Sequence, residues 1–173
     1  MSVASPESPP ALRQRLIRNL HDAHLQREQR PPLYDSMSVR LSSGTAARKL
    51  GAGYDVLAPG QRVCPYHLHH AQEEMFVILE GQGTLRVADE LLPLRAGDVV
   101  FIPPGPEYPH QIINTSDAPL KYLSISTQER PEVCEYPDSD KVGVRVAGPI
   151  DGDVGHNGQH RRASALDYWD GEP

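Results

Sequence analysis

Hydrophobic positions follow two different periods along the chain. Near the N-terminus, apolar residues recur at spacings of four and five, which places them on one face of a helix: Leu12, Leu16, Ile17 and Leu20. This pattern predicts a helix from Pro10 to about His24, after a polar tail over residues 1–10. The Pro31–Pro32 pair cannot continue a helix, so the helical pattern ends there.

Beyond these prolines the pattern is that of short strands. Met37, Val39 and Leu41 alternate with polar residues, as in a half-buried strand whose apolar side chains face the core. Further strands are predicted over residues 54–57, 74–80, 84–88, 91–94, 98–102, 110–114 and 120–126. Turn residues separate them at roughly ten-residue intervals, which favours an antiparallel sandwich or barrel. The fold class predicted is therefore all-β with a short N-terminal helix.

The same pattern divides the chain into three segments. Residues 1–35 are predicted to form a tail and helical arm, 36–147 the β-barrel, and 148–173 an irregular C-terminal tail. Tyr168 and Trp169 are the aromatic pair expected to fix that tail to the body.

Composition excludes several classes of partner. The 173 residues carry a formal net charge of -6 and no basic block, so nucleic acid and anionic membrane surfaces are not expected partners. The two cysteines form neither a Cys-x-x-Cys pair nor a disulfide framework. The chain shows no leader-like start and no run near the ~20 apolar residues of a membrane span. We therefore expect a cytoplasmic protein.

Candidate chemistry is concentrated in two segments. His67 and His69 project from the same face of a strand, with their backbones about 7 Å apart, a spacing suited to gripping one metal ion. Glu74 is preferred to Glu73 as a carboxylate ligand because it shares a face with Phe76 and Ile78. His110, from a later strand, would be the fourth ligand.

Both segments resemble the two motifs of the cupin superfamily. Gly60, His67, His69, Glu74 and Gly81 match the first motif with one extra residue after Gly60; Gly97, Pro103, Gly105, His110 and Asn114 match the second with two extra residues before the histidine. The resemblance covers roughly residues 50–127 and looks closest to small single-domain bacterial cupins of undefined activity. It implies a jelly-roll (double-stranded β-helix) barrel, a homodimer, and metal-ligand roles for His67, His69, Glu74 and His110.

The reaction is left open by these residues. A metal-dependent enzyme acting on a small polar metabolite is the first hypothesis, with isomerase-type or oxygenase-type chemistry and iron, manganese, zinc or nickel as the divalent metal. A non-catalytic small-molecule-binding cupin is the second, and a structural or storage barrel the third. His70 is interpreted as an exterior histidine and Cys64 as a small buried hydrophobe. Whether Arg86, Lys121 and Tyr122 face inward stays open.

Overall fold

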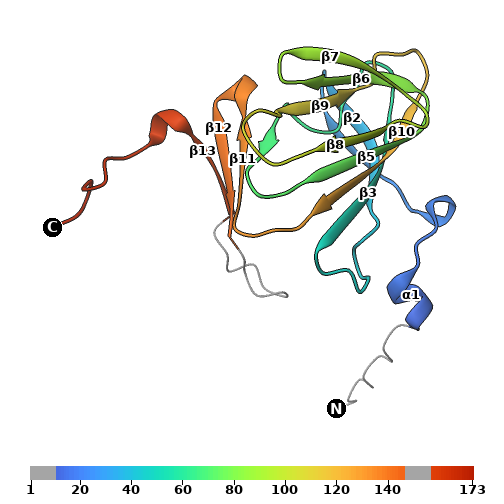
Figure 1. The fold of residues 1–173 in the computed structure, drawn as a ribbon, viewed down its shortest axis with the longest axis horizontal. Helices are drawn as coiled ribbons and strands as arrows, with labels where there is room; N and C mark the ends of the chain where they lie inside the picture. Colours follow the sequence, from blue (N-terminus) through green and yellow to red (C-terminus); the bar gives the residue numbers. More distant parts are fainter. Residues whose placement is uncertain (1–10, 147–156) are drawn as a thin grey trace.

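The strands assemble into antiparallel sheets that close around one interior (Figure 1). A computed structural model describes residues 11–146 and 157–173. The largest sheet has six strands in the order β1 (Gln26–Arg30), β2 (Tyr34–Arg40), β3 (Leu50–Leu57), β10 (Leu120–Thr127), β5 (Glu74–Glu80) and β8 (Val99–Ile102). Every neighbouring pair in it is antiparallel.

Two smaller sheets complete the barrel. One is β7 (Glu90–Arg95), β6 (Gln82–Val87) and β9 (His110–Ile113), and the other is β13 (Asn157–Arg161), β12 (Lys141–Arg145), β11 (Glu132–Tyr136) and β4 (Leu68–His69). The helical elements are short: α1 (Leu12–Leu16) and three 3₁₀ turns at Leu20–Asp22, Pro137–Ser139 and Arg162–Ser164. The all-β prediction with a short N-terminal helix is confirmed. Among the described residues no helix is long and apolar enough to cross a membrane.

The hydrophobic core is formed by the six-stranded and three-stranded sheets. Nine of their buried side chains pack together: Leu57, Phe76, Ile78, Leu85, Leu94, Ile102, Ile112, Leu120 and Tyr122. Burying each such side chain contributes about 1.5–3 kcal/mol, so this cluster supplies most of the hydrophobic stabilisation. A tight turn follows β5 at Gly81, whose positive φ of 86° suits glycine and where a Cβ would collide with the Pro119 carbonyl oxygen.

Two sequence predictions about the N-terminal region need correction. The helix ends at Leu16 instead of near His24, and the chain is extended from Ile17, because the apolar stripe has nothing to pack against: Leu12 and Leu16 are exposed. The segment 1–35 is not only an arm, since β1 pairs with β2 and extends the sheet. The tail predicted at residues 1–10 lies outside the described residues.

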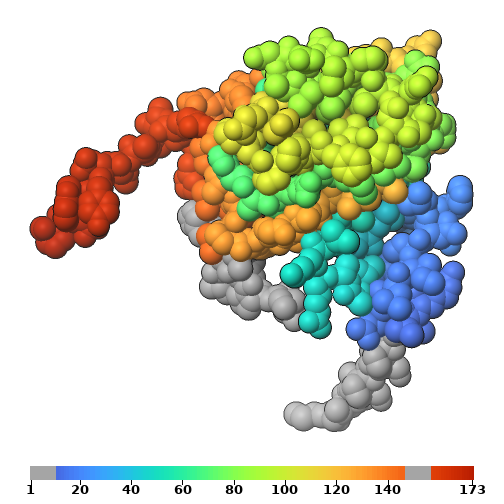
Figure 2. Space-filling model, in the orientation of Figure 1, coloured from blue at the N-terminus to red at the C-terminus, as the bar shows by residue number. Residues whose placement is uncertain are grey.

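The strand predicted around Met37 faces the opposite way. In β2 it is Ser36 that is buried, while Met37 is exposed, so the polar set faces the interior. At the C-terminus, β13 pairs with β12, so the tail is not wholly irregular. Tyr168 and Trp169 contact each other but are largely exposed, and the arm that carries them stands away from the body (Figures 1 and 2). The predicted anchoring of the tail by these aromatics is wrong.

Candidate metal centre

Backbone pairing brings the two motifs together. His67 and His110 exchange hydrogen bonds across an isolated bridge, with the N–H of His110 2.7 Å from the carbonyl oxygen of His67 and the return contact at 3.1 Å. The Gly105 N–H donates to the His69 carbonyl oxygen at 2.8 Å. His69 lies in β4, Glu74 begins β5 and His110 begins β9. The second motif is therefore fixed against the first by main-chain bonds, and the two extra residues before His110 do not displace it.

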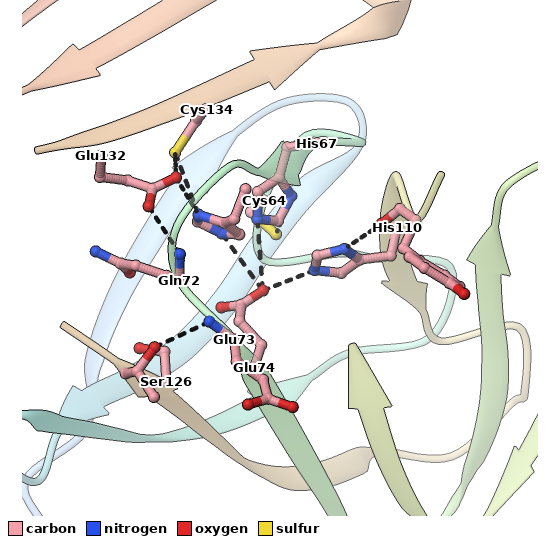
Figure 3. Close-up of polar contacts among 12 residues, drawn as sticks. Cys64, His67, Gln72, Glu73, Glu74, His110, Ser126, Glu132 and Cys134 are labelled. Carbon is pink, nitrogen blue, oxygen red and sulfur yellow. Dashed lines mark hydrogen bonds and ion pairs between the residues drawn. The ribbon is translucent and has the colours of Figure 1, made fainter. Parts of the chain in front are cut away.

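The three predicted histidine ligands converge on one carboxylate oxygen of the fourth predicted ligand, Glu74. Figure 3 shows His67 and His110 facing that carboxylate. Glu74 Oε2 lies 2.7 Å from His110 Nε2, 3.4 Å from His69 Nε2 and 3.9 Å from His67 Nε2. All four side chains are buried or nearly so. Three chain segments thus present three imidazole nitrogens and one carboxylate oxygen to a common point.

The outer nitrogen of each imidazole, Nδ1, contacts a neighbouring polar group that orients the ring. The Nδ1 of His67 faces the Pro65 carbonyl oxygen at 2.9 Å, and the Nδ1 of His110 faces the Tyr108 carbonyl oxygen at 3.1 Å. Because a carbonyl can only accept, these contacts place a proton on the Nδ1 of each ring, and Nε2 is the nitrogen that faces Glu74. Hydrogen bonding at the outer nitrogen is the usual way in which proteins orient metal-binding histidines.

His69 is oriented by a buried carboxylate that the sequence did not reveal. Glu132 is fully buried, and its Oε1 lies 3.3 Å from His69 Nδ1. The same carboxylate accepts the backbone N–H groups of His70, Ala71 and Gln72 at 3.1, 3.1 and 2.9 Å. Glu132 therefore fixes both the ring of His69 and the loop that follows it.

The inner nitrogen of His69 gives a direct test of whether a metal fits. His69 Nε2 is buried and has no hydrogen-bond partner, although it lies close to the Glu74 carboxylate. A buried polar atom without a partner costs about 1–3 kcal/mol, and a cation bound between the two groups would remove that cost. Three histidines and one carboxylate are a ligand set that first-row divalent metals accept. The residues present fit such an ion.

The charges of the cluster are strongly coupled. Burial, together with the neighbouring His110, lowers the pKa of His67 to about 4. Burial would also lower the pKa of His69, but the nearby Cys134 and the Glu74 carboxylate outweigh it and raise that pKa to about 10. Burial would raise the pKa of Glu74, yet its contacts with His110 and His69 hold it well below its usual range. Glu74 is thus ionised, and His69 is the ring that holds a proton to balance it.

The remaining predicted side chains lie around this centre without joining it. His70 is half-exposed and pairs with Glu135 at 2.9 Å, as expected of an exterior histidine. Cys64 lies 3.8 Å from the outer nitrogen of His67, and burial raises its thiol pKa to about 12, so it is a neutral group. Cys134 and Glu132 form a second cluster with His69, but on the outer side of its ring.

The three side chains whose direction was left open are now placed. Arg86 stacks on the Tyr66 ring, 3.7 Å from its centroid, and pairs with Asp138. Lys121 pairs with Glu80 at the surface at 2.8 Å. Only Tyr122 faces the interior, where it packs edge-on against Phe76.

A cavity of about 620 Å³ opens beside the histidines. His67, His69 and Glu74 form part of its wall, together with inward-facing residues of β2, β3 and β10. A volume of this size holds a small metabolite. The cavity adjoins the packed core, because Phe76 and Tyr122 belong to both.

Comparison with known proteins places this architecture in a family. A family profile described as a cupin domain matches residues 53–126. Residues 53–126 of this chain are therefore a cupin domain. The cupin domain begins within β3 and ends within β10, so the N-terminal hairpin β1–β2 lies outside the matched region.

Individual relatives cover different parts of this cupin. An uncharacterized protein of Methanocaldococcus jannaschii is 40% identical over 60 residues, 35% of this chain and 46% of the relative. An oxalate-binding protein of Thermotoga maritima is 35% identical over 69 residues, 40% of this chain and 54% of that protein. The chain thus spans about half the length of these curated relatives. A candidate sugar phosphate isomerase of Acidithiobacillus ferrooxidans matches in structure with a TM-score of 0.77 at 24% identity, over 91% of this chain and 98% of that one. At that identity the likeness shows the fold.

Proposed function

We propose that this cupin binds one divalent transition metal through His67, His69, Glu74 and His110. The observation that carries the proposal is the orientation of the three rings, whose outer nitrogens are occupied and whose inner nitrogens face one Glu74 oxygen. Such a preorganised set needs little rearrangement on binding an ion. The buried His69 Nε2 without a hydrogen bond supports the same conclusion.

We further propose that the protein is an isomerase-type enzyme acting on a small hydroxylated carbonyl compound. A metal held at this site would supply Lewis-acid polarisation of a carbonyl or hydroxyl oxygen. The cavity beside the ligands offers room for such a compound, and its wall orients it next to them. The similarity over nine tenths of the chain to a candidate sugar phosphate isomerase favours this class over an oxygenase.

A non-catalytic binding role is the second candidate. The oxalate-binding relative, which matches the cupin domain, favours it. The two candidates differ in one observable: an isomerase exchanges a carbon-bound hydrogen next to the carbonyl with solvent, and a binding protein does not. A storage or structural barrel is disfavoured because the interior beside the histidines is hollow and polar.

Metal content tests the first proposal. Purified protein, reconstituted with iron, manganese, zinc or nickel, should contain about one ion per chain by mass spectrometry. A His67→Ala/His69→Ala variant should lose the ion, while His70→Ala, which changes an exterior histidine of the same segment, should keep it. A folded wild-type chain that retains no ion would refute the proposal. Deuterium incorporation from D₂O into a panel of sugar phosphates, followed by NMR, tests the isomerase step.

A homodimer and a cytoplasmic location belong to the same proposal. Large apolar side chains are exposed on and beside the edge strands β7 and β8: Leu91, Leu92, Val99 and Phe101. Edge strands need covering, and a second copy of the chain would cover them. Both cysteines are free thiols, which suits the reducing cytoplasm; fractionation of cells tests the compartment.

A further inference from the structure

A second polar cluster faces the same cavity as the histidines. Asp55 of β3 is 6% exposed, and its two carboxylate oxygens accept hydrogen bonds from the hydroxyls of Ser38 at 2.7 Å and Ser124 at 2.8 Å. These three residues, called the serine–aspartate cluster below, come from β2, β3 and β10 and all line the cavity. Neighbouring strands therefore aim three polar groups at one region of the interior.

Burial of the serine–aspartate cluster destabilises the folded protein, so folding alone does not explain it. Among the described residues Asp55 forms no ion pair, and the charge that acts on it from β1, Glu28, is of the same sign. A buried carboxylate without a cation is destabilising unless hydrogen bonds compensate it. Two serine hydroxyls compensate it only in part, so a role in ligand recognition explains its presence better than stability does.

The backbone next to the cluster makes room for it. A Cβ on Gly53 would lie 2.6 Å from the Ser124 hydroxyl oxygen, and one on Gly51 would lie 2.6 Å from Gln128 Nε2. Both glycines line the cavity in β3. A side chain at Gly53 would displace Ser124 and narrow the space beside Asp55, and one at Gly51 would displace Gln128 from the cavity wall. The absence of side chains there keeps the cluster accessible from the cavity.

The hydrogen-bonding character of the cluster selects the kind of group that can bind. Each serine donates its hydroxyl proton to Asp55, so the lone pairs that remain on the serines and the carboxylate can only accept. A ligand must therefore present donors, as hydroxyl groups do. Arg40 and Arg145 are exposed and line the same cavity, together with the carboxylates Glu28 and Glu74, so an anionic group on the ligand has two cationic partners there.

We infer that the serine–aspartate cluster is a subsite for the hydroxyl groups of a polyhydroxylated anion, whose other groups reach the metal ligands and the arginines. The inference rests on the proposed function, since it assumes that the metal-loaded barrel binds a small molecule. It adds a chemical class to that ligand. It also assigns Ser38, Asp55 and Ser124 as residues that determine specificity, without a role in holding the metal.

Binding of matched probes to the zinc-loaded protein tests the inference. Glycerate, gluconate and glucose 6-phosphate form the hydroxylated set, and propionate, hexanoate and hexyl phosphate are their hydroxyl-free counterparts. Calorimetry should show at least one hydroxylated probe binding about tenfold or more tightly than its counterpart. Asp55→Asn, and separately Ser38→Ala with Ser124→Ala, should remove about ten- to hundredfold of that preference. Asp35→Asn, a carboxylate change in the same sheet paired with Arg27 at the surface, is the matched control.

The metal content of each variant separates the two ways of failing. Loss of the ion from the wild-type protein would refute the proposed function, whatever the probes do. A wild type that holds zinc but binds hydroxylated and hydroxyl-free probes alike would overturn the subsite and leave the metal site standing. The same holds if Asp55→Asn and the double serine variant, both folded by circular dichroism, keep the full preference. The expected result is a full complement of zinc in all variants, with the preference lost only in those of the cluster.

Discussion

Replacing Glu132 by glutamine should weaken metal binding, although Glu132 is not itself a proposed metal ligand. In the wild type one carboxylate oxygen accepts the N–H groups of Ala71 and Gln72, and the other faces the N–H of His70 and the Nδ1 of His69. A glutamine keeps one acceptor oxygen and turns the second into an NH₂ donor. If the oxygen keeps the two backbone donors, the NH₂ group opposes two further donors. Glu132→Gln therefore preserves shape and reverses hydrogen-bond polarity at one position.

The expected magnitude follows from the bonds that are lost. Hydrogen bonds to a charged acceptor contribute about 1.5–3 kcal/mol each, and breaking a buried charged network costs about 3–5 kcal/mol. One backbone bond and the His69 contact are lost, so we expect a decrease of about 3–5 kcal/mol in the free energy of unfolding. His69 can relieve the conflict only by accepting at Nδ1, which leaves its remaining proton on Nε2, the nitrogen proposed to bind the metal. Metal affinity should fall about 10–100-fold, as for other outer residues of metal sites.

Urea unfolding and chelator competition measure the two effects separately. Glu135→Gln is the matched control, because Glu135 lies on the same strand β11 but faces outward to His70 and Arg162. The control should change unfolding free energy by less than about 1 kcal/mol, as expected of a surface ion pair. A folded Glu132→Gln variant whose metal affinity stays within twofold of the wild type would refute the argument that Glu132 sets the tautomer of His69.

Four further predictions concern the cluster charges, the cavity and the surface. Because the nearby Cys134 and Glu74 outweigh burial and raise the pKa of His69 to about 10, metal binding at pH 7 should release about one proton per chain. Calorimetry in buffers of different ionisation enthalpy measures this release, and a value near zero would contradict the prediction. Burial raises the pKa of Asp55, so Asp55 ionises at a lower pH in the unfolded chain than in the folded one, and its charge destabilises the fold as the pH rises. Asp55→Asn should therefore raise the urea midpoint at pH 7 by more than it does in acid. An equal gain at both pH values would contradict this. Gly53→Ala should push Ser124 aside and cost about 1–3 kcal/mol in urea unfolding, whereas no loss would mean that the strand shifts freely. Phe101→Glu on β8 should convert a dimer to a monomer in ultracentrifugation, and a wild type that is already monomeric at micromolar concentration would disprove the dimer.

Sequence pattern succeeded where the constraint is local. The spacing of His67, His69 and Glu74 around turns fixes which face of each strand they occupy, and the structure brings all three together with His110. Their roles as ligands stay a prediction. Glu132 could not be found in this way, because its partners are backbone N–H groups about sixty positions away, and those leave no mark on side-chain spacing.

The alternation of apolar and polar residues correctly predicted a strand at β2, but it assigned the wrong face of that strand to the interior. An amphipathic strand has two faces, and the rule that apolar residues point inward holds only where the interior is apolar. At β2 the interior is partly polar: Ser38 lines the cavity and Ser36 is buried, while Met37 is exposed. The helix prediction failed for a related reason, since a stripe such as Leu12 and Leu16 forms a stable helix only against a packing surface.

The N-terminal hairpin has a consequence for how such proteins can diversify. Its strand β2 contributes Ser38 and Arg40 to the cavity wall, yet it precedes the stretch that carries the recognisable cupin domain. The residues proposed to bind the metal ion and some of those proposed to determine ligand specificity thus lie in separate, consecutive stretches of the chain. Exchange of residues 26–40 between related barrels would alter which ligand the cavity binds while leaving the proposed metal ligands unchanged. The hairpin is in this sense an exchangeable specificity element, and a starting point for engineering new ligand selectivity.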